Sequence, residues 1–260
     1  WELCNGTVIL VGAKIRSNAP LVNKHLYELT QESKQFHLVS IKRGKETIIP
    51  QGSDQILAND ILYFTTLRKY VNILPELLGK KSFETKKLMF MGGSRIAMRT
   101  IQQLPQNIDI KIIEQDRERA QMLVEKCPSN VTVFIEDGRN SEFLLREGIA
   151  ETDAFLALTD NSEANILGCM VAKQYGVKKT VAEIENIDYI SMAEQLDIGT
   201  VINKKLIAAS AIYELLLKAD ASNIKSLTYA DANVGEVIAK PKSKVTRKPI
   251  KDLNLPANIT

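Results

Sequence analysis

The segment from Gly92 to Ala97 has the spacing of a turn that binds the phosphates of a nucleotide. In a Gly-x-Gly-x-x-Gly/Ala turn, the first glycine makes a tight bend and the second lets the backbone approach a pyrophosphate. Gly92 and Ala97 fill the first and third positions, and Ser94 replaces the second glycine. The Cβ of Ser94 crowds a phosphate, whereas its hydroxyl offers a hydrogen-bond donor. Taken alone, the pattern fits a phosphate-binding turn and an empty strand–helix turn equally well.

Glu114 strengthens the nucleotide interpretation. It ends the next predicted strand, twenty-two residues after Gly92, where an acid accepts hydrogen bonds from ribose hydroxyls. An acid there repels a 2′-phosphate, which favours NAD or a plain adenosine nucleotide over NADP. Asp137 follows the third predicted strand, and Thr159 and Asp160 follow the fourth, so all face the edge where open α/β sheets bind ligands. The alternative is a set of solvated carboxylates at strand ends.

No catalytic or metal-binding arrangement is evident in the sequence. The two histidines, His25 and His37, both lie in the first part of the chain, far from the turn. The three cysteines, Cys4, Cys127 and Cys169, have no Cys-x-x-Cys spacing, which indicates reduced thiols and a cytosolic compartment. The Gly-x-x-x-x-Gly-Lys-[Ser/Thr] phosphate loop is absent. We therefore predict no catalytic residue and no metal ligand.

Composition sets the broad class. The chain has 260 residues, 45% of them hydrophobic, which is enough for about two domains with real cores. Its 34 Lys and Arg against 31 Asp and Glu give a net charge of +3, so nucleic acid is not predicted as a partner. The most apolar stretch, residues 206–217, is shorter than the ~20 residues of a membrane span. Because the chain begins at Trp1 without Met, we expect a fragment.

The elements before the turn predict a small α+β module over residues 1–79. Apolar alternation indicates strands at residues 7–11, 36–41, 47–49 and 61–65. Pro20 is expected to open an amphipathic helix, and a closing helix is expected over residues 68–78, ending at Gly79. Residues 80–87 are expected to be a charged linker.

Residues 86–220 show the strand–helix alternation of a parallel sheet. Strands are predicted at residues 88–91, 108–114, 131–135, 154–159 and 180–184. Helices are predicted at residues 95–104, 117–126, 142–147, 163–175 and 189–195. A further helix over residues 204–218 is apolar around most of its surface, so it must pack against another lobe or another subunit.

The last part of the chain, residues 221–260, contains an imperfect echo of the first module. Residues 237–240 read Val-Ile-Ala-Lys where residues 11–14 read Val-Gly-Ala-Lys. Each stretch is followed by a proline and spaced apolar residues, at residues 249–255 and 20–26. We expect these residues to begin a second copy of the small module, cut short at Thr260.

These motifs resemble the RCK (regulator of potassium conductance) domains of the TrkA family, the regulatory subunits of Trk-type bacterial potassium uptake. The resemblance rests on residues 49–64, on the turn at residues 91–97 and, most specifically, on residues 157–165, Ala-Leu-Thr-Asp-Asn-Ser-Glu-Ala-Asn. It implies an α/β fold in which a Rossmann-like parallel-sheet domain is flanked by small α+β RCK C-terminal subdomains. The second of these is expected to be truncated.

The resemblance also implies a pocket for NAD(H) or an adenine nucleotide such as ATP or ADP. The implied cofactor-binding residues are Gly92, Ser94, Arg95, Glu114, Asp137 and Thr159. One departure opposes this: residues 181–185 carry Glu183 and Glu185 where many RCK domains have a phosphate-binding arginine, and carboxylates repel a pyrophosphate.

The function implied is that of a cytoplasmic, nucleotide-sensing regulatory subunit, peripheral on the inner face of the cell membrane. Its expected partners are a Trk-type membrane potassium transporter and further copies of itself, as a homodimer or homotetramer. Ligand-dependent rearrangement of domains would gate the membrane subunit. Two alternatives stay open: an NAD-dependent oxidoreductase, and a structural RCK half that binds no nucleotide.

Overall fold

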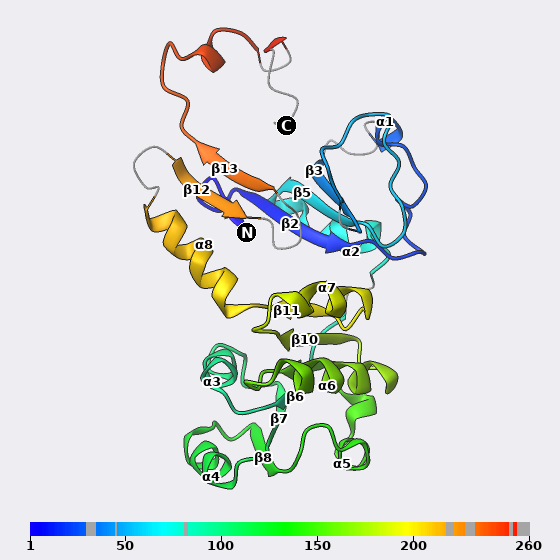
Figure 1. The fold of residues 1–260 in the computed structure, drawn as a ribbon, viewed down its shortest axis with the longest axis vertical. Coiled ribbons are helices and arrows are strands. Elements are labelled where there is room, and N and C mark those ends of the chain that lie inside the picture. The colour runs from blue at the N-terminus through cyan, green and yellow to red at the C-terminus, as the bar shows by residue number, and fades with distance from the viewer. Residues whose placement is uncertain are drawn as a thin grey trace. The chain divides into compact units, whose positions relative to one another are not determined.

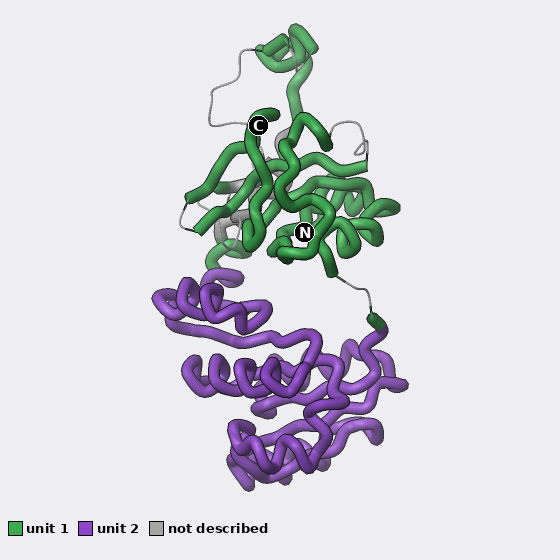
Figure 2. The backbone as a smooth tube through the Cα atoms, turned by 90° about the vertical axis from the view of Figure 1, so that its right-hand side faces the viewer, with its two compact units in different colours: residues 1–83, 209–260 green, residues 84–208 purple. Residues whose placement is uncertain are grey.

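The computed structural model describes residues 1–29, 35–44, 46–80, 83–216, 221–226, 232–249 and 252–253. The chain divides into two compact units (Figure 2). Unit 1 comprises residues 1–83 and 209–260, and unit 2 comprises residues 84–208.

Unit 2 is built on a six-stranded parallel sheet with the order β11-β10-β9-β6-β7-β8 (Figure 1). Its strands are β6 (Lys87–Met91), β7 (Asp109–Glu114), β8 (Val131–Ile135), β9 (Ala154–Ala157), β10 (Lys179–Glu183) and β11 (Thr200–Ile202). The chain returns from β8, at one edge, to β9 in the centre, so β6 and β9 are neighbours where the strand order reverses. The predicted α/β, Rossmann-like fold is confirmed.

Five helices link these strands, and a sixth follows the last one. They are α3 (Arg95–Ile101), α4 (Arg117–Lys126), α5 (Ser141–Arg146), α6 (Ser162–Gln174), α7 (Asp188–Gln195) and α8 (Lys204–Leu216). Successive side chains of β6 point to opposite faces of the sheet. Phe90 packs with residues of α3 and α4, whereas Met91 lies against Gly168 of α6. This double coverage explains why the strand reads as a continuous apolar run.

Sequence reasoning missed β11, because three residues are too few to show a period. The predicted helix over residues 204–218 is α8 up to Leu216, and residues 217–218 lie outside the described residues.

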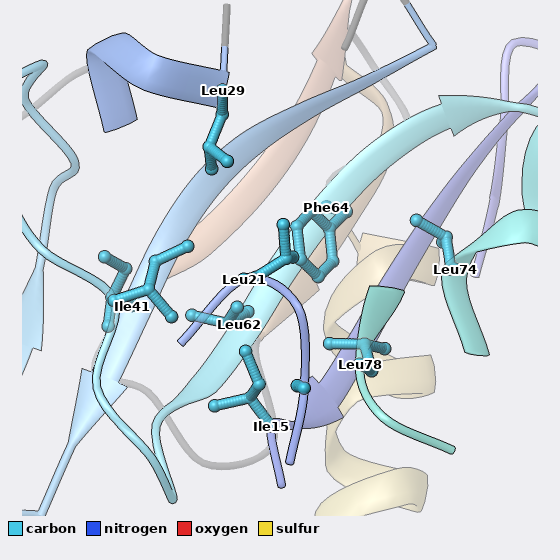
Figure 3. Close-up of a cluster of buried hydrophobic side chains, with 10 residues drawn as sticks. Ile15, Leu21, Leu29, Ile41, Leu62, Phe64, Leu74 and Leu78 are labelled. Atoms are coloured by element: carbon cyan, nitrogen blue, oxygen red, sulfur yellow. The ribbon is translucent and has the colours of Figure 1, made fainter. Parts of the chain in front are cut away.

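Unit 1 holds a five-stranded antiparallel sheet with the order β1-β2-β5-β3-β4. Its strands are β1 (Glu2–Leu3), β2 (Val8–Lys14), β3 (Phe36–Arg43), β4 (Glu46–Ile48) and β5 (Ile61–Leu67). One cluster of buried side chains, including Ile15, Leu21, Ile41 and Phe64, forms the core of this module (Figure 3). The predicted small α+β module is therefore present.

The helix predicted from Pro20 is wrong. Among the described residues that follow Pro20, Leu26–Leu29 form the helix α1, and Leu21 lies in a turn with its side chain buried. Asn23 has a φ of +65°, which no α-helix accepts, and its N–H donates to the carbonyl of Ile56 at 2.8 Å. The backbone therefore bonds to a distant segment instead of to itself, and apolar spacing alone does not reveal that choice.

The closing helix is only partly correct. Residues Arg68–Ile73 form a 3₁₀ helix, and α2 (Leu74–Leu77) follows it. Pro75 lies in the first turn of α2, where proline is tolerated but cannot donate a hydrogen bond to an earlier turn. Gly79 ends the segment with a φ of +70°, as predicted.

The last part of the chain contains an antiparallel hairpin of β12 (Ala221–Ser226) and β13 (Asn233–Val237), followed by a 3₁₀ turn at Lys244–Thr246. Residues 250–251 and 254–260, which carry much of the predicted echo, lie outside the described residues. Of the helices that are described, none has both the length and the apolar character that crossing a membrane requires.

We predict that Asp60→Asn destabilises unit 1. Asp60 is 1% exposed and accepts from Arg43 Nε at 2.9 Å, from Arg43 Nη2 at 2.8 Å and from the Leu57 N–H at 2.9 Å. An amide turns one acceptor into a donor that faces other donors, and it leaves the Arg43 guanidinium without its buried anionic partner. Urea unfolding should lose about 2–3 kcal/mol. Glu28→Gln, at an exposed carboxylate of the same unit, should change stability by less than about 0.5 kcal/mol. Equal effects would contradict the prediction.

Candidate functional site

A cavity of about 180 Å³ lies at the carboxyl edge of the parallel sheet, beside the ends of β6, β7, β8 and β9. Five of the six predicted site residues line it: Gly92, Ser94, Glu114, Asp137 and Thr159. The sixth, Arg95, is exposed at the start of α3 and is not among the lining residues. Arg119 and Arg139, which sequence reasoning did not select, bring positive charge to the same cavity.

Gly92 is the bend of the turn. It has a φ of +92°, and its N–H donates to the carbonyl of Ile113 at 2.8 Å. A Cβ at this position would lie 2.8 Å from Thr159 Cγ2, so a larger residue is excluded by space as well as by conformation. The turn therefore packs directly on the segment that follows β9.

Gly93 allows close packing of a helix on the turn, a role that the Gly-x-Gly-x-x-Gly/Ala pattern assigns to its last residue. A Cβ here would lie 2.1 Å from Leu123 Cδ1 of α4. The missing side chain lets α4 approach the turn closely. The motif reading overlooked this, because Gly93 falls on a position that the pattern leaves free.

Ser94 is the N-cap of α3, where its Oγ accepts the N–H of Ala97 at 3.3 Å. As an acceptor in this bond, the hydroxyl keeps its own proton for donation. The side chain that replaces glycine thus stabilises the helix start and still offers a donor toward the cavity that it lines.

Glu114 holds the turn in place. Its carboxylate is 5% exposed, Oε2 accepts the Gly93 N–H at 2.9 Å, and Oε1 accepts the Asp116 N–H at 3.0 Å. Arg119 Nη1 lies 3.7 Å from Oε2. The strand-end acid was predicted as a ribose ligand, and in this structure its two oxygens already accept from the backbone.

Asp137 is paired at the opposite wall. Arg139 donates to it through Nε at 3.0 Å and Nη2 at 2.7 Å, and the Arg139 N–H adds a third bond at 2.9 Å. These hydrogen bonds from Arg139 lower the pKa of Asp137 below its usual range. Asp137 is therefore an anion with a bound cation, and a ligand that takes either partner must compete with the other.

Thr159 is tied to Asn165, a fully buried residue of α6. The Thr159 N–H and hydroxyl both donate to Asn165 Oδ1, at 3.1 Å and 2.6 Å. Sequence reasoning missed Asn165, although an amide on the helix face that also carries Ile166 and Cys169 was an available signal.

The two acids that depart from the family pattern do not line the cavity. Lys204 Nζ lies 2.5 Å from Glu183 Oε1 and 2.8 Å from Glu185 Oε1. Hydrogen bonding by Lys204 lowers the pKa of Glu185, and the two carboxylates raise the pKa of Lys204. The expected repulsion of a phosphate is reduced, because a lysine of the same chain neutralises part of the negative charge.

The thiol and metal-ligating side chains of the described residues form no second candidate site. Burial raises the pKa of the Cys169 thiol to about 12, so this side chain is a core residue. No group of three or more His, Cys, Asp or Glu side chains in the described part of the chain could hold a metal ion. A second cavity, of about 210 Å³, lies at the amino edge near Lys87 and Asp109, away from the edge where such sheets bind ligands.

Comparison with known proteins gives the family. The TrkA-N domain family matches residues 88–204, and the TrkA-C domain family matches residues 10–78. The chain belongs to the TrkA family. TrkA-N thus covers nearly all of unit 2, including the cavity, and TrkA-C covers the five-stranded module.

Two relatives illustrate the extent of the match. The Trk system potassium uptake protein TrkA of Vibrio alginolyticus is 30% identical over 258 residues, which are 97% of this chain and 56% of that protein. TrkA homolog 1 of Methanosarcina mazei is 26% identical over 254 residues, 96% of this chain and 62% of that protein. The chain therefore spans somewhat more than half the length of these relatives.

Solved structures agree on the fold. The GsuK RCK domain has a TM-score of 0.54 at 14% identity, covering 81% of this chain and 45% of its own. The GsuK channel bound to NAD gives 0.53 at 15% identity, covering 81% and 37%. At this identity the likeness shows the fold alone.

We predict that Gly92→Ala lowers the free energy of unfolding by about 2 kcal/mol more than Gly176→Ala does. Both glycines have a positive φ, +92° and +87°, so both substitutions strain the backbone. Only at Gly92 would the new methyl meet a neighbour, whereas nothing lies within 4 Å at Gly176. Urea unfolding of the two variants measures the difference. An equal loss of stability in the two variants would show that Gly92 does not pack against Thr159.

Proposed function

We propose that this chain is part of a nucleotide-sensing regulatory subunit of a potassium uptake transporter. The observation that carries the proposal is the cavity of the TrkA-N domain, where Gly92, Ser94, Glu114, Asp137 and Thr159 meet at the carboxyl edge of the sheet. The relatives named as Trk system potassium uptake proteins support the transport role. Unit 2 takes the role of sensor, and the membrane transporter is the partner that responds.

The chemistry of the cavity favours NAD(H) or an adenine nucleotide such as ATP or ADP. The Ser94 hydroxyl and the cations of Arg119 and Arg139 suit phosphate groups. Glu114 and Asp137 carry negative charge toward ribose and base, and this charge opposes a 2′-phosphate. At about 180 Å³ the cavity is smaller than the roughly 300 Å³ at which ligand pockets usually begin, so a bound nucleotide stays partly exposed. The GsuK channel, a structural neighbour, has been solved with NAD bound.

We assign no catalytic residue to the chain. An NAD-dependent oxidoreductase needs an acid or base beside the nicotinamide, and the carboxylates of Glu114 and Asp137 are engaged by N–H groups and Arg139. Steady turnover of NAD(H) with a panel of hydroxy acids would overturn this assignment.

We also propose the domain order that the family suggests. Residues 1–79 are one small C-terminal subdomain, residues 86–220 are the nucleotide-binding subdomain with its following helix, and residues 221–260 begin a second small subdomain. The assembly works in the cytoplasm, at the inner face of the membrane.

Calorimetry with ATP, ADP, NAD and NADH tests the proposed function. We expect at least one of them to bind, and Glu114→Gln to weaken that binding about ten- to a hundred-fold. The amide replaces one of the two acceptor oxygens that hold the turn with a donor, and it removes the negative charge toward the ribose. Glu118→Gln, an exposed acid in the first turn of α4, should bind like the wild type. Failure of all four nucleotides to bind at millimolar concentration would reject the function. Equal affinity of both variants would reject the role of Glu114.

We further propose that α8 contacts another copy of the chain. Four large apolar side chains of this helix are exposed by 57–78%: Ile207, Ile212, Leu215 and Leu216. Such a concentration of apolar surface is typical of an interface.

Ile212→Asp tests this contact, because it would place an unpaired charge in a buried interface. Sedimentation should show a smaller species than the wild type. Val124→Asp is the control, since Val124 is 64% exposed on α4. A wild-type association state in the Ile212→Asp variant, or equal dissociation of both variants, would contradict the role of α8.

A further inference from the structure

Asn165 connects the cavity wall to the next strand of the sheet. Its Oδ1 accepts both the N–H and the hydroxyl of Thr159, and its Nδ2 donates to the carbonyls of Thr159 at 2.9 Å and Glu183 at 2.7 Å. These four bonds use the full capacity of the amide, and the side chain is completely buried. A change in the position of Thr159 therefore alters the hydrogen bonds of Asn165 and, through them, the end of β10.

Glu183 continues the connection through its side chain. The residue is 2% exposed, and its Oε1 accepts no well-aligned hydrogen bond from the described residues. The ammonium of Lys204, 2.5 Å away, supplies the charge that offsets the burial of this carboxylate. Because Lys204 is the first residue of α8, the end of β10 and the start of α8 are held together by this ion pair.

A cation in the first turn of a helix is unfavourable against the helix dipole, so local propensity does not explain Lys204. Its neighbour Asn203 binds the same junction. Asn203 Nδ2 donates to the carbonyl of Ile184 at 2.7 Å, and Asn203 Oδ1 accepts the N–H of Leu206 at 2.9 Å. The first turn of α8 is thus seated on the end of β10 by side chains of both residues, and α8 then leads the chain out of unit 2.

We propose that Asn165 and the Glu183–Lys204 ion pair couple the cavity wall at Thr159 to the seating of the first turn of α8. Asn165 is the positioning residue of this connection, which we call the Asn165 relay: Thr159, Asn165, Glu183 and Lys204. A ligand that accepts the Thr159 hydroxyl proton competes with Asn165 Oδ1 for it. Such a ligand binds with one affinity when the first turn of α8 is held on the end of β10 and with another when it is released. Coupling requires this difference in affinity. Only the identity of the ligand rests on the proposed function.

Hydrogen exchange of this chain without any ligand tests the relay. The readout is the exchange rate of the Leu206 and Ile207 amides, which are bonded to Asn203 Oδ1 and to the Asn203 carbonyl. Thr159→Val removes the hydroxyl with little change of shape, and Lys204→Met removes the ammonium. Each should speed these two amides about five-fold or more. The double variant should exchange no faster than the faster single variant, because both changes break the same connection.

Two control variants and an internal reference separate coupling from general loosening. Lys205→Met removes a lysine that contacts only Glu185 of the two acids, at 3.8 Å, and Asp160→Asn changes the cavity edge next to Thr159. Neither should alter the two amides. In every variant, the amides of residues 110–113, in the interior strand β7, should keep their wild-type rates. Unchanged α8 amides in Thr159→Val, multiplying effects in the double variant, or equal effects in the controls would overturn the relay.

A second arm uses ADP as the probe. ADP at saturation should change the rates of the Leu206 and Ile207 amides in the wild type and leave them unchanged in Lys204→Met. ADP that binds the wild type without affecting these amides would overturn the coupling to ligand. If no nucleotide binds, the proposed function fails, while the ligand-free variants still decide whether the relay exists.

Discussion

The candidate site depends on one buried carboxylate. Glu114 ends β7, and its two oxygens hold the N–H groups of Gly93 and Asp116. A carboxylate at 5% exposure is stable only with such partners. The bonds fix the turn after β6 relative to the turn after β7. The wall at Thr159 packs against the first of these turns, at Gly92.

Three glycines at the site allow close contact between neighbouring segments, because they have no side chain. Gly92 lets the first turn lie on Thr159, Gly93 admits Leu123 of α4, and Gly138 leaves room for Met91, whose Cγ would lie 2.2 Å from an added Cβ. Each glycine faces a different neighbour, so close packing at these positions depends on the absence of a side chain. Close packing of this kind limits the conformational entropy that the site loses when a ligand binds.

Prediction from the sequence succeeded where a pattern is long or chemically specific. The alternation of apolar strands and amphipathic helices over residues 86–220 determined the fold class, and the boundaries of α4 and β8 were correct. It failed where tertiary bonds override local preference, as at Pro20, where Asn23 bonds to Ile56. In the site, the glycine turn and Glu114 were recognisable types at fixed spacing. Asn165, Arg119 and Lys204 were not selected, because only the folded chain shows that they contact Thr159, Glu114 and Glu183.

The reversal of strand order between β6 and β9 has a consequence for folding. Strands β6, β7 and β8 are consecutive both in sequence and in the sheet, and so are β9, β10 and β11. Each half can pair locally as it leaves the ribosome, whereas the seam between β6 and β9 must wait until residues 154–157 have been synthesised. The cavity straddles that seam, with Gly92 on one side and Thr159 on the other. A molecule bound there would therefore protect the junction between the two halves of the sheet and slow its opening.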